Sequence, residues 1–136
     1  MLNSLLRAFG LARKHQVVEP AWAERIVAAL EKSGLKAKVE HRLQDASRVD
    51  ILTGYYAVEV DWAPKWAEGV GQSLYYALKT SKKPALLLLI EDVHKEDVFA
   101  ARAGAVCKNV RPEIALWLFY VPSKRLNMDG AVIQVD

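Results

Sequence analysis

The chain has 136 residues, of which 52% are hydrophobic and 26% are charged, a composition typical of one globular domain with a buried core. Nineteen basic and sixteen acidic residues give a net charge of +3, which excludes a uniformly basic nucleic-acid coat but allows a local basic surface. The single cysteine excludes an internal disulfide framework, and no segment has the roughly 18 apolar residues of a membrane-spanning helix. We expect one cytoplasmic domain with no membrane contact, in which residues 1–19 are an arm, 20–122 the core and 123–136 a tail.

Residues 2–12 place apolar side chains at helical spacing and predict a short amphipathic helix. We expect its apolar side to pack on the domain or on a second subunit, which would make the protein a homodimer. A position on a membrane surface is the alternative. The segment has no basic region ahead of a long apolar run and is therefore a poor secretory signal, while a transit peptide stays open.

The next segments predict a helix and then a strand. The stretch AWAERIVAALEKSG, residues 21–34, predicts a helix with Ile26 and Leu30 in its buried stripe. Residues 35–43 alternate between apolar and polar side chains, which is typical of a half-exposed strand with a mostly basic outer face. His41 stands on the apolar side, where we expect a partly buried imidazole with a satisfied hydrogen bond.

Residues 48–61 predict a β-hairpin whose turn is Gly54-Tyr55, with glycine first as in a type II′ turn. In that register position 50 faces position 59, and position 48 faces position 61. Successive side chains of a strand point to opposite faces, so the hairpin residues divide into two sets. One face has Val49, Ile51, Val58 and Val60, and the other has Arg48, Asp50, Glu59 and Asp61.

Asp50 and Glu59 become direct cross-strand neighbours in this register, with Cβ atoms roughly 4.5–5.5 Å apart. Like charges at that distance destabilise a sheet, so a raised pKa, a basic side chain or a bound cation must offset the repulsion. Mg²⁺ is commonly held by one or two carboxylates together with substrate phosphates. The pair therefore favours a metal-dependent phosphodiester site, with Mg²⁺ or Mn²⁺ and no organic cofactor.

The rest of the chain predicts a helix, a central strand, a second helix and a second buried strand. The first helix, beginning near Pro64, has an apolar stripe and a polar face, and its two glycines are expected to allow close packing on the sheet. Residues 85–90 are apolar on both faces, as in a covered central strand. The helix of residues 94–109 is expected to bury Val98, Ala101, Ala105 and Val106, with Cys107 as a small buried hydrophobe. Residues 114–120 are expected to form the second buried strand, and the tail is expected to add an edge strand. The order is α-β-β-β-α-β-α-β, a mixed sheet with helices on both faces, preceded by the short N-terminal helix.

Asp50, a gap of eight residues, and then Glu59-Val60-Asp61 at the end of the second hairpin strand resemble the motif of the PD-(D/E)xK nuclease superfamily. The following helix with KWAEGVGQSLYYALK and the strand PALLLLI occur in the same order in that family. The resemblance covers roughly residues 21–120. It implies a restriction-endonuclease-like fold, related to the Holliday-junction-resolvase core, and hydrolysis of DNA.

The resemblance also implies roles for particular residues. Metal ligands would be Asp50, Glu59 and the Val60 carbonyl. Asp61 is either an added metal ligand or the ion-pair partner of Arg48, which the hairpin register puts opposite it. The family's lysine would stand at position 61, where this chain has an aspartate, and Lys65 is the substitute that we expect. Further site residues are Gln72, which points into the active site in the family, and Glu24 from the first helix.

DNA contacts are expected from the basic residues just before the acids and from the helix after them: Lys32, Lys36, Lys38, Arg42, Arg48 and Tyr76. Two alternatives stay open. A relative of the fold could have lost cleavage and bind nucleic acid or a protein, as the aspartate at position 61 suggests. An unrelated α/β domain could also have the carboxylate pair on its surface.

Overall fold

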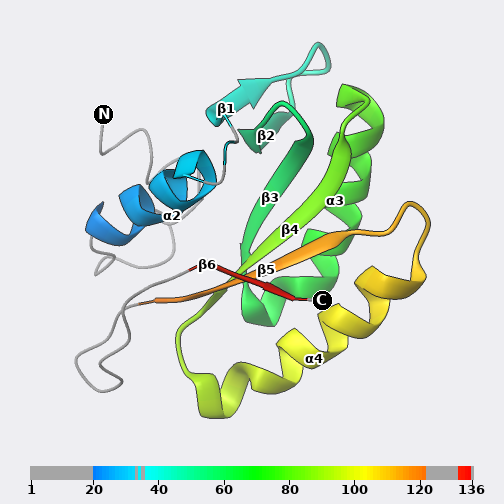
Figure 1. The fold of residues 1–136 in the computed structure, drawn as a ribbon. Coiled ribbons are helices and arrows are strands. Elements are labelled where there is room, and N and C mark those ends of the chain that lie inside the picture. The colour runs from blue at the N-terminus through cyan, green and yellow to red at the C-terminus, as the bar shows by residue number, and fades with distance from the viewer. Residues whose placement is uncertain (1–19, 33, 35, 122–131, 136) are drawn as a thin grey trace.

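The protein is an α/β domain built on one mixed sheet, as Figure 1 shows. The computed structural model describes residues 20–32, 34, 36–121 and 132–135. The elements follow one another in the predicted order, with a short strand added near the C-terminus. They are α2 (Pro20–Lys32), β1 (Lys38–Arg42), β2 (Arg48–Leu52), β3 (Tyr56–Trp62), the 3-10 turn η1 (Ala63–Lys65), α3 (Trp66–Thr80), β4 (Lys83–Ile90), α4 (Val93–Asn109), β5 (Ala115–Tyr120) and β6 (Val132–Val135).

The six strands found among the described residues lie in the order β1-β2-β3-β4-β5-β6. The first three form an antiparallel meander, because short turns can join only antiparallel neighbours. The strands β3, β4 and β5 are parallel, and the helices α3 and α4 make the two crossovers between them. The edge strand β6 returns antiparallel to β5, which confirms the strand predicted for the tail.

Two hydrophobic cores lie on the two faces of the sheet. On one face, α2 buries Ile26 and Leu30 against the sheet; α3 and α4 cover the other face (Figure 1). The strand β4 supplies both cores, since its residues 85, 87 and 89 belong to the first and residues 86, 88 and 90 to the second. The prediction of a central strand buried on both sides is confirmed.

The β2–β3 hairpin has the predicted register but not the predicted turn. Ile51 pairs with Val58, and Leu52 pairs with Ala57. Among the described glycines only Gly34 has a positive φ, so the turn at residues 54–55 is not of type II′.

The hydroxyl of Thr53 closes this turn instead. It accepts hydrogen bonds from the backbone N–H groups of Tyr55 (3.1 Å) and Tyr56 (2.7 Å). The backbone N–H of Thr53 also donates to the Tyr56 carbonyl at 2.9 Å. The hydrogen bonds of the Thr53 side chain therefore stabilise the turn that the sequence pattern attributed to glycine.

The inward face of α4 differs from the prediction. Ala100, Ala103 and Cys107 are buried, whereas Val98 is 45% exposed and residues 101 and 105 are exposed. Small side chains on the buried face let the helix lie close to the sheet, and this outweighs the burial of one valine. The buried Glu96 accepts hydrogen bonds from the backbone N–H groups of residues 91 and 92, which fixes the first turn of the helix.

The helix α3 approaches the sheet at Gly69 and not at Gly71. A Cβ atom on Gly69 would lie 2.7 Å from Cδ1 of Leu86, whereas nothing lies within 4 Å of one on Gly71. The close-packing prediction is therefore right for the first glycine and wrong for the second. The helix predicted for residues 2–12 lies outside the described residues. None of the helices in the described part is long and apolar enough to span a membrane.

Candidate active site

Two carboxyl groups meet on the β2–β3 hairpin. Asp50 stands one step beyond the Ile51–Val58 pair, and its side chain is hydrogen-bonded to that of Glu59. The predicted cross-strand neighbours are therefore in contact. Both point to the α3 face of the sheet, because Glu59 is the parallel partner of Leu86, a member of the core beneath α3 and α4.

A side chain replaces a backbone group in the sheet at this point. The N–H of Val60 donates a 2.8 Å hydrogen bond to Oδ2 of Asp50 rather than to a backbone carbonyl of β2. The N–H and C=O groups of one strand residue point to the same neighbouring strand. The Val60 carbonyl is therefore also directed toward the β2 side, next to the two carboxyl groups.

Burial is the main reason that both carboxyl groups have raised pKa values. Desolvation, and then the charge of Asp50, raises the pKa of Glu59 to about 10. Desolvation likewise raises the pKa of Asp50 to about 7, against the hydrogen bond from Val60 and the positive charge of Arg48. Glu59 is only 5% exposed, whereas Asp50 is partly exposed. The pair therefore holds a proton at neutral pH, and solvent reaches it from the Asp50 side.

A polar face of α3 lies over the pair. The charge of Glu68 raises the pKa of Glu59. The pKa of Tyr76 is raised to about 12, first by desolvation and then by the charges of Glu59 and Asp50. Gln72 lies between them at four-residue spacing and is partly buried. The structure thus brings the helix face with Gln72 and Tyr76 to the carboxyl groups.

Asp61 and Lys65 lie at the carboxyl end of β3. The Asp61 carboxylate accepts the backbone N–H of Trp62 at 2.9 Å, and its charge raises the pKa of both Asp50 and Glu59. Lys65 ends η1 and is exposed. The positive charge that lowers the pKa of Asp50 is that of Arg48.

The donor atoms suit a hard divalent cation. Two carboxyl groups and a backbone carbonyl are oxygen ligands of the kind that Mg²⁺ and Mn²⁺ prefer. A cation between Asp50 and Glu59 would stabilise the charged form of both carboxyl groups, which burial disfavours. No group of three or more His, Cys, Asp or Glu side chains in the described part of the chain is arranged to hold a metal. The fit therefore depends on the carboxyl pair together with the Val60 carbonyl.

Three of the predicted basic residues share the face of the carboxyl groups. In the β1–β2 pairing Arg42 is opposite Arg48 and Lys38 is opposite Leu52, and cross-strand partners point to the same side. Asp50 lies two residues from Arg48 and is on that side as well. Lys32, by contrast, ends α2 on the opposite face of the sheet, and Lys36 belongs to the connection after it. The predicted cluster is therefore divided between two faces.

A cavity of about 640 Å³ lies beside these strands, lined by residues 41–45 and Lys79. Arg42 and Lys79 give it positive charge, and Asp45 gives it a negative charge. The charge of Asp45 also contributes to the raised pKa of Tyr76, which links this cavity to the carboxyl pair. A basic hollow and the acidic pair are thus neighbours on one face.

Sequence reasoning missed the contact between Asp45 and Tyr75. The Tyr75 hydroxyl donates a hydrogen bond to the carboxylate of Asp45, and Ser47 donates to it through both its hydroxyl and its N–H. The Ser47 and Tyr75 hydrogen bonds lower the pKa of Asp45 to about 2. The contact ties the β1–β2 turn to α3. No local pattern in the sequence indicates this contact.

Two further predictions concern α2 and β1. The side chain of Glu24 lies outside the described residues, and α2 itself covers the face opposite the carboxyl pair. His41 is partly buried as expected, but its buried Nδ1 has no hydrogen-bond partner among the described residues, so the prediction of a satisfied imidazole is wrong.

The geometry therefore defines a candidate site from Asp50, Glu59 and Val60, with Gln72 and Tyr76 above them. No protein-family model matches the chain, and comparison with curated proteins and with solved structures gave no significant match.

Proposed function

We propose that the protein is a metal-dependent nuclease of the PD-(D/E)xK type with a restriction-endonuclease-like core, and that it hydrolyses phosphodiester bonds in DNA. The observation that carries the proposal is the buried contact between Asp50 and Glu59, with the Val60 N–H bound to Asp50. Packing alone does not favour two desolvated acids in contact, whereas a cation site requires them.

Each residue has a role in this proposal. Asp50, Glu59 and the Val60 carbonyl hold the cation, and the negative charge of Asp61 acts on the two acids from the end of β3. A divalent cation would supply Lewis-acid activation of the phosphate and of the attacking water. Gln72 orients the water or the phosphate from the helix above. Lys65 provides the positive charge that the family takes from position 61.

The DNA backbone would approach along the basic side of the meander. Lys38, Arg42 and Arg48 share the face of the acids, and Lys79 lines the adjoining cavity with Arg42. Phosphate contacts of this kind position a nucleic acid without reading its sequence. A homodimer would supply a second site for the second strand.

The test is cleavage of linear, single-stranded and branched DNA with Mg²⁺ or Mn²⁺. Wild-type protein is compared with Asp50→Asn and Glu59→Gln, and Asp97→Asn on the exposed side of α4 is the matched control. We expect metal-dependent cutting that both site variants abolish and the control keeps. Circular dichroism establishes that the variants are folded. If wild-type protein neither cuts any substrate nor binds Mn²⁺, the proposal is wrong.

A second candidate is a nuclease-fold protein that binds nucleic acid or a protein without cutting. The observation in its favour is Asp61, whose negative charge raises the pKa of both site acids where a lysine would lower it. Mn²⁺ binding without cleavage on any substrate would favour this candidate over the first.

A further inference from the structure

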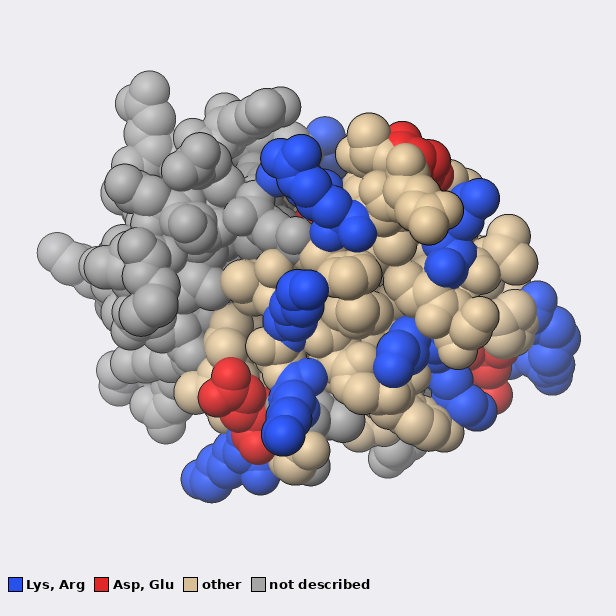
Figure 2. Space-filling model, turned by 90° about the horizontal axis from the view of Figure 1, so that it is seen from above, with Lys and Arg blue, Asp and Glu red and all other residues tan. Residues whose placement is uncertain are grey.

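The end of the sheet at which β3, β4 and β5 begin combines exposed tyrosines with lysines. Tyr55 is 50% exposed, and the Lys83 ammonium lies over its ring, 5.5 Å from the centroid. Tyr75 is 39% exposed, and the ammonium of Lys79 lies 5.7 Å from its ring centroid. Figure 2 views the molecule from this end and shows Lys and Arg side chains spread over it, with few acidic side chains between them.

The Tyr55–Lys83 pair lies next to the end of α3, the helix that holds the Tyr75–Lys79 pair. The chain from the end of α3 to the start of β4 runs alongside the β2–β3 turn, where Lys82 Nζ donates to the Gly54 carbonyl at 2.8 Å and the backbone N–H of Lys83 donates to the Tyr55 carbonyl at 3.0 Å. Lys79 and Tyr75 are on the last turns of that helix. Lys83 is therefore held beside Tyr55, and Lys82 is held at the same turn.

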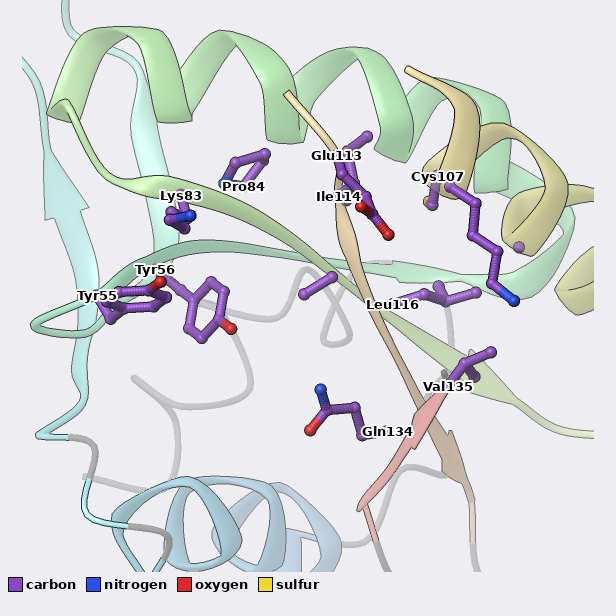
Figure 3. A pocket seen from close by; sticks show the side chains of 13 residues that line it. Tyr55, Tyr56, Lys83, Pro84, Cys107, Glu113, Ile114, Leu116, Gln134 and Val135 are labelled. Atoms are coloured by element: carbon purple, nitrogen blue, oxygen red, sulfur yellow. The ribbon is translucent and has the colours of Figure 1, made fainter. Parts of the chain in front are cut away.

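A cavity of about 310 Å³ opens beside Tyr55 and Tyr56. This volume is at the lower end of the range for small-ligand pockets. Figure 3 shows the two tyrosines on one side of the cavity, Leu116 and Val135 on the other, and Gln134 directed into the space between them. The cavity thus has an aromatic wall and an apolar wall.

The polar groups of the cavity are of two kinds. Lys83 and Lys108 are cations that suit a phosphate, and Glu113 and Gln134 offer acceptors and an amide for the edge of a base. Tyr56 is anchored from behind by an edge-to-face contact with Trp117, with centroids 5.2 Å apart. The aromatic wall is therefore held in place by the core.

We infer that this surface binds single-stranded nucleic acid, with one unpaired base in the cavity beside Tyr55 and Tyr56. Positive charge that follows a backbone, interrupted by exposed rings, is the arrangement that binds unpaired strands, since bases in a duplex cannot stack on a side chain. The inference deepens the proposed nuclease function by naming its substrate class as unpaired or partly unpaired DNA.

The distance to the candidate active site suits this reading. Tyr55 and Glu59 are four residues apart, which is about 13 Å along the strand. A strand cut at the Asp50–Glu59 pair would reach the cavity with a short unpaired end.

The test is binding of a fluorescein-labelled eight-residue oligothymidylate and of a blunt duplex, measured by anisotropy in EDTA so that cleavage plays no part. We expect the single strand to bind more tightly. Tyr55→Ala should weaken its binding about 5- to 100-fold, and Tyr55→Trp should restore it. Lys83→Gln and Lys108→Gln should each lower the salt dependence by about one phosphate contact, while Lys95→Gln at the other end of α4 is the control.

The inference is wrong if the duplex binds as tightly as the single strand, or if Tyr55→Ala binds like wild type. Because binding is read without metal, the result is independent of the nuclease test. Cleavage without an effect of Tyr55 would leave the proposed function standing and overturn this inference. Binding of the single strand without any cleavage would support this inference and count against the proposed nuclease function.

Discussion

The backbone N–H of Val60 donates a 2.8 Å hydrogen bond to the side chain of Asp50, across the hairpin from it. A regular antiparallel ladder would give this N–H a backbone carbonyl of β2. The substitution directs both the Asp50 carboxyl group and the Val60 carbonyl to one place, next to Glu59. The oxygen atoms of Asp50, Glu59 and the Val60 carbonyl therefore lie together, where they can bind a cation.

Glu59→Gln should stabilise the metal-free protein at alkaline pH. The raised pKa values mean that the folded protein binds more protons than the unfolded chain, so stability falls as pH rises from about 4, the unfolded value, through about 7 for Asp50 and about 10 for Glu59. Replacing Glu59 by the neutral glutamine removes most of this loss of stability with rising pH. Urea unfolding at pH 8.5 should show a gain of at least about 1 kcal/mol and a flatter pH profile. An equal or steeper profile than wild type would contradict the assignment, and Asp97→Asn is the control.

Mn²⁺ binding should release protons. The pair holds a proton at neutral pH, and carboxylates must be deprotonated to bind a cation, so the affinity for Mn²⁺ should rise with pH up to about pH 10, the raised pKa of Glu59. Calorimetry in two buffers of different ionisation enthalpy counts the released protons. We expect between one and two protons at pH 7 for wild type, one from Glu59 and about half of one from Asp50, and no binding for Glu59→Gln. Binding that is unchanged in Glu59→Gln would place the metal elsewhere.

Gly69→Ala and Gly71→Ala should have opposite effects on stability. The added Cβ at position 69 would lie 2.7 Å from a side-chain atom of the fully buried Leu86, so either that side chain or α3 must shift, at a cost of about 1–3 kcal/mol. Position 71 is exposed with nothing within 4 Å, and alanine there should stabilise the helix by up to about 1 kcal/mol. Thermal unfolding of both variants measures the difference. Equal effects would mean that α3 does not contact the sheet at Gly69.

Thr53→Ala should weaken the hairpin that holds the acids. The Thr53 hydroxyl is buried and accepts the N–H groups of Tyr55 and Tyr56, and its loss should cost about 1–2 kcal/mol. Thr53→Ser keeps the oxygen and should recover most of that stability. Hydrogen exchange of the two tyrosine amides should speed up in the alanine variant alone. Unchanged exchange would show that backbone contacts are enough to close the turn.

The sequence alone determined the order of the elements and the division of the hairpin between two faces. Strand side chains alternate strictly, so Val58 and Val60 in the core require Glu59 to point to the other side. The six apolar residues of 85–90 likewise allowed only a strand covered on both faces. Local periodicity contains the type of each element and the face of each strand side chain, because alternate residues of a strand lie on opposite faces of the sheet.

The tertiary structure decided what periodicity does not contain. The inward face of α4 depends on how closely Ala100 and Ala103 approach the sheet, and hydrophobicity ranked Val98 above them. The contact of Asp45 with Tyr75 joins residues 30 positions apart, and no local pattern indicates it. The raised pKa values of Asp50 and Glu59 likewise arise from burial beneath a helix that follows them in the chain, because desolvation is set by everything that surrounds a group and not by its neighbours in sequence.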